Sequence, residues 1–268
     1  MLTFPNAKIN LGLYITEKRA DGYHNLETVF YPLPKLRDAL EFVPAKNDRG
    51  AFHATGLPIA EGDAPNLVSQ ACKLLRARFP GKIPEQDIHL HKAIPMGAGL
   101  GGGSADAAFA LKAMNAAYSL GLSQNELAVM ALELGSDCPF FIYNTPQFAQ
   151  GRGEIFTPLS LDLSAYSIQV VCPAVHVSTR EAFAGIVPQA ASFDLRKLAE
   201  WPVERWRGQV RNDFETSVFV QHPQLAEIKE SLYQSGAVYA SMSGSGSAVY
   251  GVFEKGRRAV MDGSFYFE

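Results

Sequence analysis

The chain has 268 residues, of which 47% are hydrophobic and 19% charged. This composition argues against extensive disorder, and the length suffices for one large domain or two smaller ones; we expect two, over residues 1–155 and 156–268. The formal net charge of −3 provides no basic field of the kind that binds nucleic acid or anionic membranes, so we expect neither class of partner.

The N-terminal residues 1–14 lack the basic region and long apolar stretch of a secretory signal, and 18 consecutive apolar residues occur nowhere in the chain. Three cysteines, Cys72, Cys138 and Cys172, are far apart and form no CxxC pair. This odd, scattered set suits a reducing compartment and packing roles better than a disulfide framework. We therefore expect a cytoplasmic protein that does not span a membrane.

The first part of the chain alternates short apolar runs with turn signals. Apolar residues along 4–14 and 27–33 predict two strands around the polar loop KRADGYHNL, and a further short strand is predicted at 39–43. Asn66 is expected to cap a helix that runs through Arg78, because apolar residues recur on one face of that segment.

A strand is predicted over 87–93, where Ile88 and Leu90 alternate with His89 and His91. The two histidines would share one strand face, a spacing that can bind a metal ion. No third ligand accompanies them in the sequence. A solvated strand face is therefore the better interpretation.

The strand leads directly into a glycine run, with five glycines in the seven positions from Gly97 to Gly103. An alanine-rich segment, 105–118, follows and predicts a helix, with Ser104 as its N-cap and Asp106 in its first turn, where the helix dipole favours a carboxylate. Exposed backbone N–H groups at a helix N-terminus favour an anion, and glycine permits close approach of a ligand. The run therefore predicts a phosphate site, with a tightly packed turn as the alternative.

The common phosphate motifs do not fit this run. Gly97, Gly99 and Gly102 satisfy GxGxxG, but a second helix follows the first, opened by a Ser123–Glu126 capping box and ended by Gly135, where a dinucleotide fold needs a strand. No lysine follows the glycines as in a Walker A loop, and protein-kinase glycine loops join two strands. The site is expected to use a less common architecture.

The remaining elements follow in regular order. A buried strand is predicted at 138–143, a turn at 150–154, strands at 166–173, 238–242 and 248–253, and amphipathic helices at 192–201 and 223–234. A second small-residue loop, Ser243–Ser247, separates the last two strands. Trp201 and Trp206 lack basic neighbours and are expected to be packing residues.

Three separate segments carry a family resemblance: AKINLGL at 7–13, PMGAGLGGGSADAA at 95–108 and SMSGSGSAVYG at 241–251. In order and spacing they resemble the three motifs of the GHMP small-molecule kinases. DGYHNLETVF at 21–30 and LGSDCPFF at 134–141 narrow the resemblance to members that phosphorylate 4-diphosphocytidyl-2-C-methyl-D-erythritol. The resemblance implies an α+β fold, with an N-terminal lobe like domain 2 of ribosomal protein S5 and a ferredoxin-like C-terminal lobe.

The resemblance also implies ATP-dependent transfer of a phosphoryl group to the 2-hydroxyl of that cytidine diphosphate substrate, in the non-mevalonate route to isoprenoid precursors. ATP would be the co-substrate and Mg²⁺ its companion ion. The ATP phosphates would rest on the glycine segment: Pro95, Met96, Gly97, Ala98, Gly99, Leu100, Gly101, Gly102, Gly103, Ser104 and Ala105.

Two residues would carry the chemistry. By resemblance Asp137 is the catalytic base, and Lys8 pairs with it and stabilises charge on the nucleophile or the transferring group. From the residues alone, Asp137 beside Gly, Ser and Pro is typical of a turn or cap, and Lys8 in an apolar strand is equally well a snorkelling surface lysine. Whether Asp137 fully abstracts the proton or mainly orients the hydroxyl stays open.

Four residues would bind the acceptor. In the resembled kinases the ring of Tyr23 stacks on the cytosine, His24 hydrogen-bonds its edge, and Phe183 closes the other side. Asn10 would contact the diphosphate or the erythritol. The backbone of Ser243–Gly246 would help to shape the phosphoryl-transfer pocket, with a tight hairpin as the alternative.

One position departs from the family. Family members often carry two serines after the glycines, and the second position here is Ala105. A hydroxyl near this point helps to hold Mg²⁺ in related kinases, so the metal ligands are unknown. We expect a monomer or weak homodimer. Two alternatives remain, a GHMP kinase for another alcohol and a nucleotide-binding regulatory protein, and retention of both Lys8 and Asp137 argues against the second.

Overall fold

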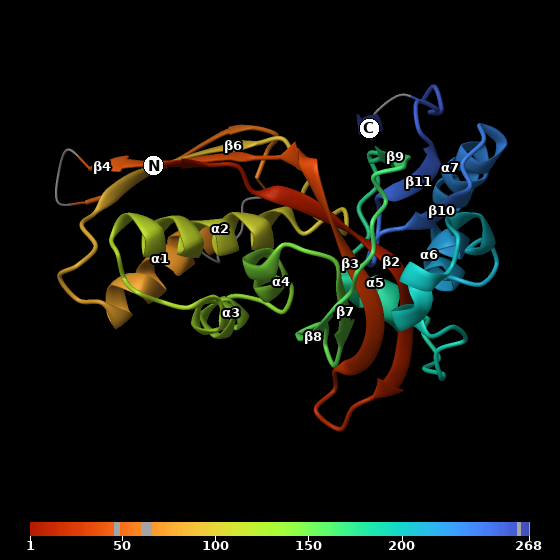
Figure 1. Ribbon diagram of the computed structural model, residues 1–268, viewed down its shortest axis with the longest axis horizontal. Helices are drawn as coiled ribbons and strands as arrows, with labels where there is room; N and C mark the ends of the chain where they lie inside the picture. Colours follow the sequence, from red (N-terminus) through yellow and green to blue (C-terminus); the bar gives the residue numbers. More distant parts are fainter. Residues whose placement is uncertain (46–48, 60–65, 262–263, 268) are drawn as a thin grey trace. The chain divides into compact units, whose positions relative to one another are not determined.

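The computed structural model describes residues 1–45, 49–59, 66–261 and 264–267 (Figure 1). The chain divides into two compact units. The first comprises Met1–Lys8, Pro32–Met96 and Gly101–Asn144, and the second comprises Ile9–Tyr31, Gly97–Leu100 and Thr145–Glu268. Each unit is assembled from separate stretches of chain, and the division interrupts the glycine run twice. The domain boundary near residue 155 stays a prediction.

The first unit contains a sheet with strand order β1-β4-β6-β5. Its strands are β1 (Leu2–Thr3), β4 (Ala39–Pro44), β5 (Phe52–Gly56) and β6 (Gln86–Lys92). Strand β5 runs parallel to β6 and the other pairs are antiparallel. Along β6 the side chains alternate as predicted, with Ile88 and Leu90 buried and both histidines exposed. One face of this strand therefore belongs to the core.

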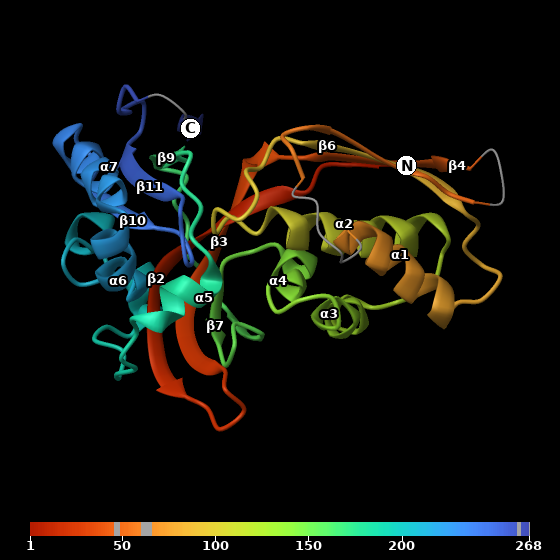
Figure 2. The same cartoon turned by 180° about the vertical axis from the view of Figure 1, so that it is seen from behind.

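The first unit also contains α1 (Leu67–Arg78), α2 (Gly102–Ala117), α3 (Gln124–Leu132) and α4 (Cys138–Tyr143). Helices α1 and α2 lie side by side along the sheet, as both views show (Figures 1 and 2). The predicted caps of α1 and α3 are confirmed: Asn66 accepts a hydrogen bond from the Val68 N–H, and Ser123 forms a capping box with Glu126.

Two secondary-structure predictions for this unit are wrong. Helix α2 begins at Gly102 rather than after Ser104, because Gly101 adopts a left-handed conformation with φ of 71° and its carbonyl accepts the Ala105 N–H. Residues 138–143 form α4 instead of a strand. Nearly every side chain of α4 is buried, so its sequence has no helical periodicity, and Pro139 suits a first helical turn.

The second unit contains β9 (Tyr166–Val171), β10 (Tyr239–Met242), β11 (Val249–Glu254) and β12 (Ser264–Phe267), in the antiparallel order β10-β11-β9-β12. A further sheet has the order β2-β3-β7-β8, with β2 (Asn6–Lys18), β3 (His24–Arg37), β7 (Gln147–Gln150) and β8 (Ile155–Pro158). The strands predicted at 166–173, 238–242 and 248–253 are confirmed.

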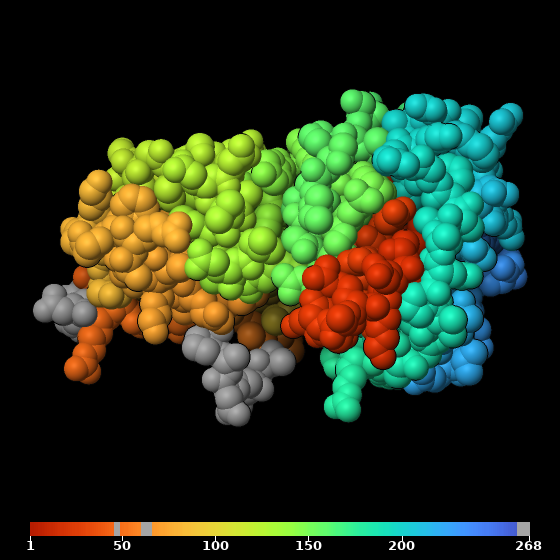
Figure 3. Space-filling model, turned by 90° about the horizontal axis from the view of Figure 1, so that it is seen from below, coloured from red at the N-terminus to blue at the C-terminus, as the bar shows by residue number. Residues whose placement is uncertain are grey.

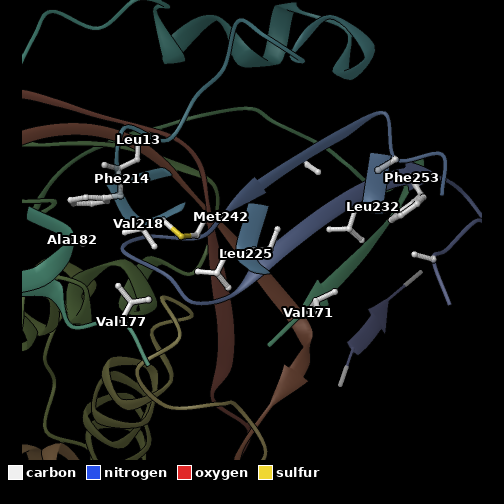
Figure 4. Close-up of a cluster of buried hydrophobic side chains, with 14 of the residues drawn as sticks. Leu13, Val171, Val177, Ala182, Phe214, Val218, Leu225, Leu232, Met242 and Phe253 are labelled. Carbon is white, nitrogen blue, oxygen red and sulfur yellow. The ribbon is translucent and has the colours of Figure 1, made fainter. Parts of the chain in front are cut away.

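The helical segments of the second unit are α5 (Thr179–Ala184), α6 (Phe214–Gln221), α7 (Pro223–Gln234) and two 3₁₀ segments, η1 (Leu195–Glu200) and η2 (Val203–Arg205). The predicted helix at 192–201 is only the short 3₁₀ segment η1, which ends at Glu200 because Pro202 restricts Trp201 to an extended conformation. Leu225 and Leu232 of α7 are buried in a cluster with Phe214 and Met242 (Figure 4).

The cysteine prediction agrees with the fold, and the packing prediction agrees for Trp206 but not fully for Trp201, which is 36% exposed. All three cysteines are free, and burial raises the pKa of each thiol to about 12. Trp206 is fully buried and its indole N–H donates to the Trp201 carbonyl. Within the described residues, no helix combines the length and apolarity required to cross a bilayer.

Candidate functional site

Lys8 and Asp137 lie close together in the first unit. The Lys8 Nζ is 3.5 Å from the Asp137 Oδ2, with 4% of the lysine side chain exposed and 33% of the aspartate. Burial lowers the pKa of Lys8, and the charge of Asp137 opposes that shift. Asp137 occupies the N-cap position of α4, but its side chain makes no capping hydrogen bond. The snorkelling interpretation of Lys8 is wrong, and the Asp137 carboxylate is open to solvent beside a buried cation.

The glycine run contributes to both units. Gly101, in the first, precedes α2, whose first N–H groups lack acceptors within the helix. A Cβ on Gly101 would lie 2.8 Å from the Phe141 ring. Gly99, in the second unit, has φ of 77°, and a Cβ there would overlap the Ser243 carbonyl oxygen. Some of these glycines are therefore required by packing as well as by any ligand.

Ser243 is hydrogen-bonded to the part of the glycine run, Gly97–Leu100, that belongs to the second unit. Its hydroxyl donates to the Gly99 carbonyl at 2.9 Å and accepts the Asn10 N–H at 3.2 Å. The Ala248 N–H donates to the Ala98 carbonyl. Asn10 is buried, and its amide nitrogen donates to the Thr28 hydroxyl at 3.0 Å. The third motif and Asn10 thus form one neutral network around Gly99, and the predicted contact of Asn10 with the acceptor stays a prediction.

Asn212 supports this network and no sequence pattern predicts it. Its side-chain amide donates to the carbonyls of Met242 and Gly244, both at 2.8 Å, and its oxygen accepts the Phe214 N–H. The bonded carbonyls lie on either side of Ser243. Asn212 therefore fixes the backbone from which the Ser243 hydroxyl projects.

The predicted base-binding residues lie together in the second unit. The His24 ring stacks on Phe183, with centroids 4.7 Å apart and planes 22° from parallel. Tyr23 is 57% exposed, and the Arg152 guanidinium lies 5.0 Å from its ring centroid. The loop that carries Tyr23 is at the surface and borders the β7–β8 turn (Figure 3), where the Gly151 carbonyl accepts the Leu26 N–H. An exposed aromatic surface is available here.

Ala105 is fully buried, and the neighbouring Ser104 hydroxyl is hydrogen-bonded to the Cys138 thiol. Among the residues that the structure describes, no group of three His, Cys, Asp or Glu side chains could hold a metal ion. His89 stacks on His53 and His91 bonds to Thr55, as suits a solvated strand face.

A second lysine cluster flanks the glycine run in the first unit. Lys92, the last residue of β6, forms ion pairs with Asp38 and, at 2.8 Å, with Asp106 of α2. All three side chains are almost completely buried. The prediction that Asp106 serves the helix dipole in the first turn is wrong, because the helix begins earlier and the carboxyl points to Lys92.

Comparisons with known proteins show the family of this chain. A model of the GHMP kinases N terminal domain matches residues 66–145, and one of the GHMP kinases C terminal region matches 186–260. The 4-diphosphocytidyl-2-C-methyl-D-erythritol kinase of Bacteroides thetaiotaomicron is 54% identical over 95% of this chain and 92% of its own length. The kinase of the same name from Cytophaga hutchinsonii is 45% identical, over 94% and 92% of the two chains.

Solved structures extend the comparison. A crystal structure of 4-(cytidine 5'-diphospho)-2C-methyl-D-erythritol kinase superimposes with a TM-score of 0.78 at 32% identity, covering 94% of this chain and 90% of the other. The Methanococcus jannaschii mevalonate kinase, at 16% identity and a TM-score of 0.65 over 96% and 92% of the chains, shows the fold alone. The predicted α+β kinase fold is confirmed. This chain belongs to the GHMP kinase family and, within it, to the 4-diphosphocytidyl-2-C-methyl-D-erythritol kinases.

Proposed function

We propose that this chain transfers the γ-phosphoryl group of ATP to the 2-hydroxyl of 4-diphosphocytidyl-2-C-methyl-D-erythritol. The observation that carries the proposal is the pair of buried Lys8 and solvent-open Asp137, 3.5 Å apart. The acceptor is the one in the names of relatives 45–54% identical to the chain. A protein that only bound nucleotide would need neither a base nor its cation.

In the proposed reaction Asp137 accepts the hydroxyl proton as the acceptor oxygen attacks the γ-phosphorus. The bond from phosphorus to the bridging oxygen breaks, and ADP leaves. Phosphoryl transfer depends mainly on positioning and on stabilisation of the spreading negative charge. Lys8, 3.5 Å from Asp137, stabilises that charge.

Residues 95–105 bind the ATP phosphates in this proposal, through backbone N–H groups at the start of α2. Support comes from the left-handed conformation of Gly97, Gly99 and Gly101, whose φ values are 67°, 77° and 71°. Glycine adopts this conformation without strain, and the N-terminal end of a 16-residue helix favours an anion.

Tyr23, His24 and Phe183 bind the cytosine. The exposed ring of Tyr23 supplies a stacking surface. In the His24–Phe183 stack, the imidazole offers a polar edge for hydrogen bonds and the phenyl ring offers an apolar surface. Stacking contributes about 1–3 kcal/mol per base at comparable sites. Tyr23→Ala should therefore weaken acceptor binding by about that amount, measured as KM for the acceptor, while Tyr23→Phe retains the ring and KM. Unchanged KM in Tyr23→Ala would place the base elsewhere.

Mg²⁺, when bound with ATP, would be held mainly by phosphate oxygens and water and would neutralise phosphate charge. The described residues form no metal-binding cluster, and Ala105 supplies no hydroxyl. Mg²⁺ commonly retains several waters and binds through substrate phosphates with one or two carboxylates. We further propose that the protein is cytoplasmic and that it is a monomer or weak homodimer. Sedimentation would test the oligomeric state.

One assay tests the proposal. ADP release is measured with ATP and, separately, the cytidine diphosphate acceptor, mevalonate and homoserine, for the wild type and Asp137→Asn. Turnover with the first acceptor alone, lost in Asp137→Asn, is expected. Turnover only with another alcohol would contradict the acceptor assignment, and ATP binding without turnover would indicate a regulatory protein.

A further inference from the structure

Three buried charged side chains join the two ends of the glycine run. Lys92 is the last residue of β6, three positions before Pro95, and Asp106 lies in the second turn of α2. Asp38 is the single residue between β3 and β4. The Lys92 Nζ donates to the Oδ2 of Asp38 and, at 2.8 Å, to the Oδ2 of Asp106. The exposed fraction of each side chain is 3% or less.

Each carboxyl group holds a different side of the run. The Asp38 Oδ1 accepts the N–H groups of Ala93 and Ile94 at 2.6 and 2.8 Å, immediately before the run begins. Asp106 ties the helix that follows the run to the same ammonium. At Gly102, the first residue of α2, a Cβ would lie 3.2 Å from the Lys92 Nζ and 3.0 Å from Ile94. The residues just before the glycine run and the helix just after it are therefore both linked to the buried ammonium of Lys92.

The cluster carries one cation for two carboxyl groups. Asp38 accepts two backbone N–H groups besides Lys92, whereas the Oδ1 of Asp106 is buried with no hydrogen-bond partner. Burial raises the pKa of Asp106 to about 8. Burial thus favours the protonated form of Asp106 over the charged form, in a cluster where one ammonium faces two carboxyl groups.

Stability alone gives a weak reason for this arrangement, because desolvation cancels much of the attraction within a buried ion pair. Its geometric consequence is specific, because it fixes the separation between the end of β6 and the start of α2. We propose that Lys92, Asp38 and Asp106 are positioning residues that hold the glycine run in its phosphate-binding conformation. The inference rests on the proposed binding of ATP to residues 95–105.

Two substitutions at one position test it. Asp106→Asn resembles the protonated acid and retains an oxygen for Lys92, whereas Asp106→Leu removes that contact and leaves Lys92 balanced by Asp38. Affinity for a non-hydrolysable ATP analogue is measured by calorimetry, with KM for ATP and for the acceptor alongside. Asp106→Leu is expected to weaken analogue binding and raise KM for ATP about tenfold, with KM for the acceptor changed less than about twofold. Asp106→Asn is expected to retain the wild-type values within about threefold.

A control separates positioning from general loss of stability. Leu232→Ala removes a fully buried side chain of α7 in the second unit and lowers the unfolding temperature without touching the run. The affinity of Leu232→Ala for the ATP analogue is expected to stay at the wild-type value. The proposal would be overturned if folded Asp106→Leu bound the ATP analogue with wild-type affinity. It would also be overturned if Leu232→Ala lost as much affinity for the analogue as Asp106→Leu. If the wild type bound the analogue but failed to phosphorylate the acceptor, the proposed function would fail while the positioning role stayed measurable.

Discussion

Two buried lysines of the first unit pair with carboxylates in contrasting surroundings. Lys8 has a partner, Asp137, that is one-third exposed and 3.5 Å away. Lys92 has two partners, Asp38 and Asp106, that are sealed from solvent. A carboxylate that is exposed to solvent can contact a substrate hydroxyl and accept its proton. A buried carboxyl group contacts only other groups of the protein. This contrast supports the proposed chemical role of the first cluster and the proposed positioning role of the second.

The largest expected effect concerns the open pair. Asp137→Asn removes the proton acceptor while preserving size, so we expect kcat to fall by about 10² to 10⁴. The thermal unfolding temperature should stay near that of the wild type, because the side chain caps no helix and is partly solvated. Near-normal turnover in this variant would remove Asp137 from the chemistry.

The two lysines should differ in their effect on stability. Lys92→Met leaves Asp38 buried without a counter-ion and should lower the free energy of unfolding by about 3–5 kcal/mol. Lys8→Met leaves Asp137 in contact with water, so its cost should stay below about 1 kcal/mol. Chemical denaturation of both variants gives the comparison. Equal losses would show that the two clusters do not differ in this way.

A further effect is a pH dependence of stability that arises in the buried cluster around Lys92. Burial raises the pKa of Asp106 from 3.8 in the unfolded chain to about 8 in the fold. The folded protein therefore binds this proton more tightly, so the stabilisation is fully present below about pH 4 and is lost as pH rises through about 8. Asp106→Asn cannot titrate, so the difference in unfolding free energy between it and the wild type should grow in its favour as the pH rises toward about 8 and then stay constant. A constant difference over that rise would contradict the protonated state.

Much of the local structure could be predicted from sequence. The caps at Asn66 and Ser123 have explicit side-chain signals, and the strand over 87–93 has a clear alternation. Helix α4 could not be identified, because its almost complete burial removes the polar face that reveals a helix. The start of α2 was misplaced because a glycine, with no side-chain signal, serves as its N-cap.

The two lysine clusters also differ in how far sequence could reveal them. Lys8 and Asp137 are far apart in the chain, and only the family resemblance joined them. For Lys92 a signal existed: the alternation that buries Ile88 and Leu90 places Lys92 on the same face. Its partner Asp38 occupies a short connection between strands, where an aspartate is typical of a turn. Only tertiary structure brings the three charges together.

The most direct test of the contrast is the turnover number of Lys8→Met and Lys92→Met, measured at saturating ATP and acceptor and normalised to folded protein. We predict that Lys8→Met loses about 10²-fold or more in kcat, because Lys8 stabilises charge in the transition state. Folded Lys92→Met should retain kcat within about tenfold, with its defect in KM for ATP. A wild-type kcat in Lys8→Met, or a greater loss in Lys92→Met, would contradict the division of roles between the two lysines.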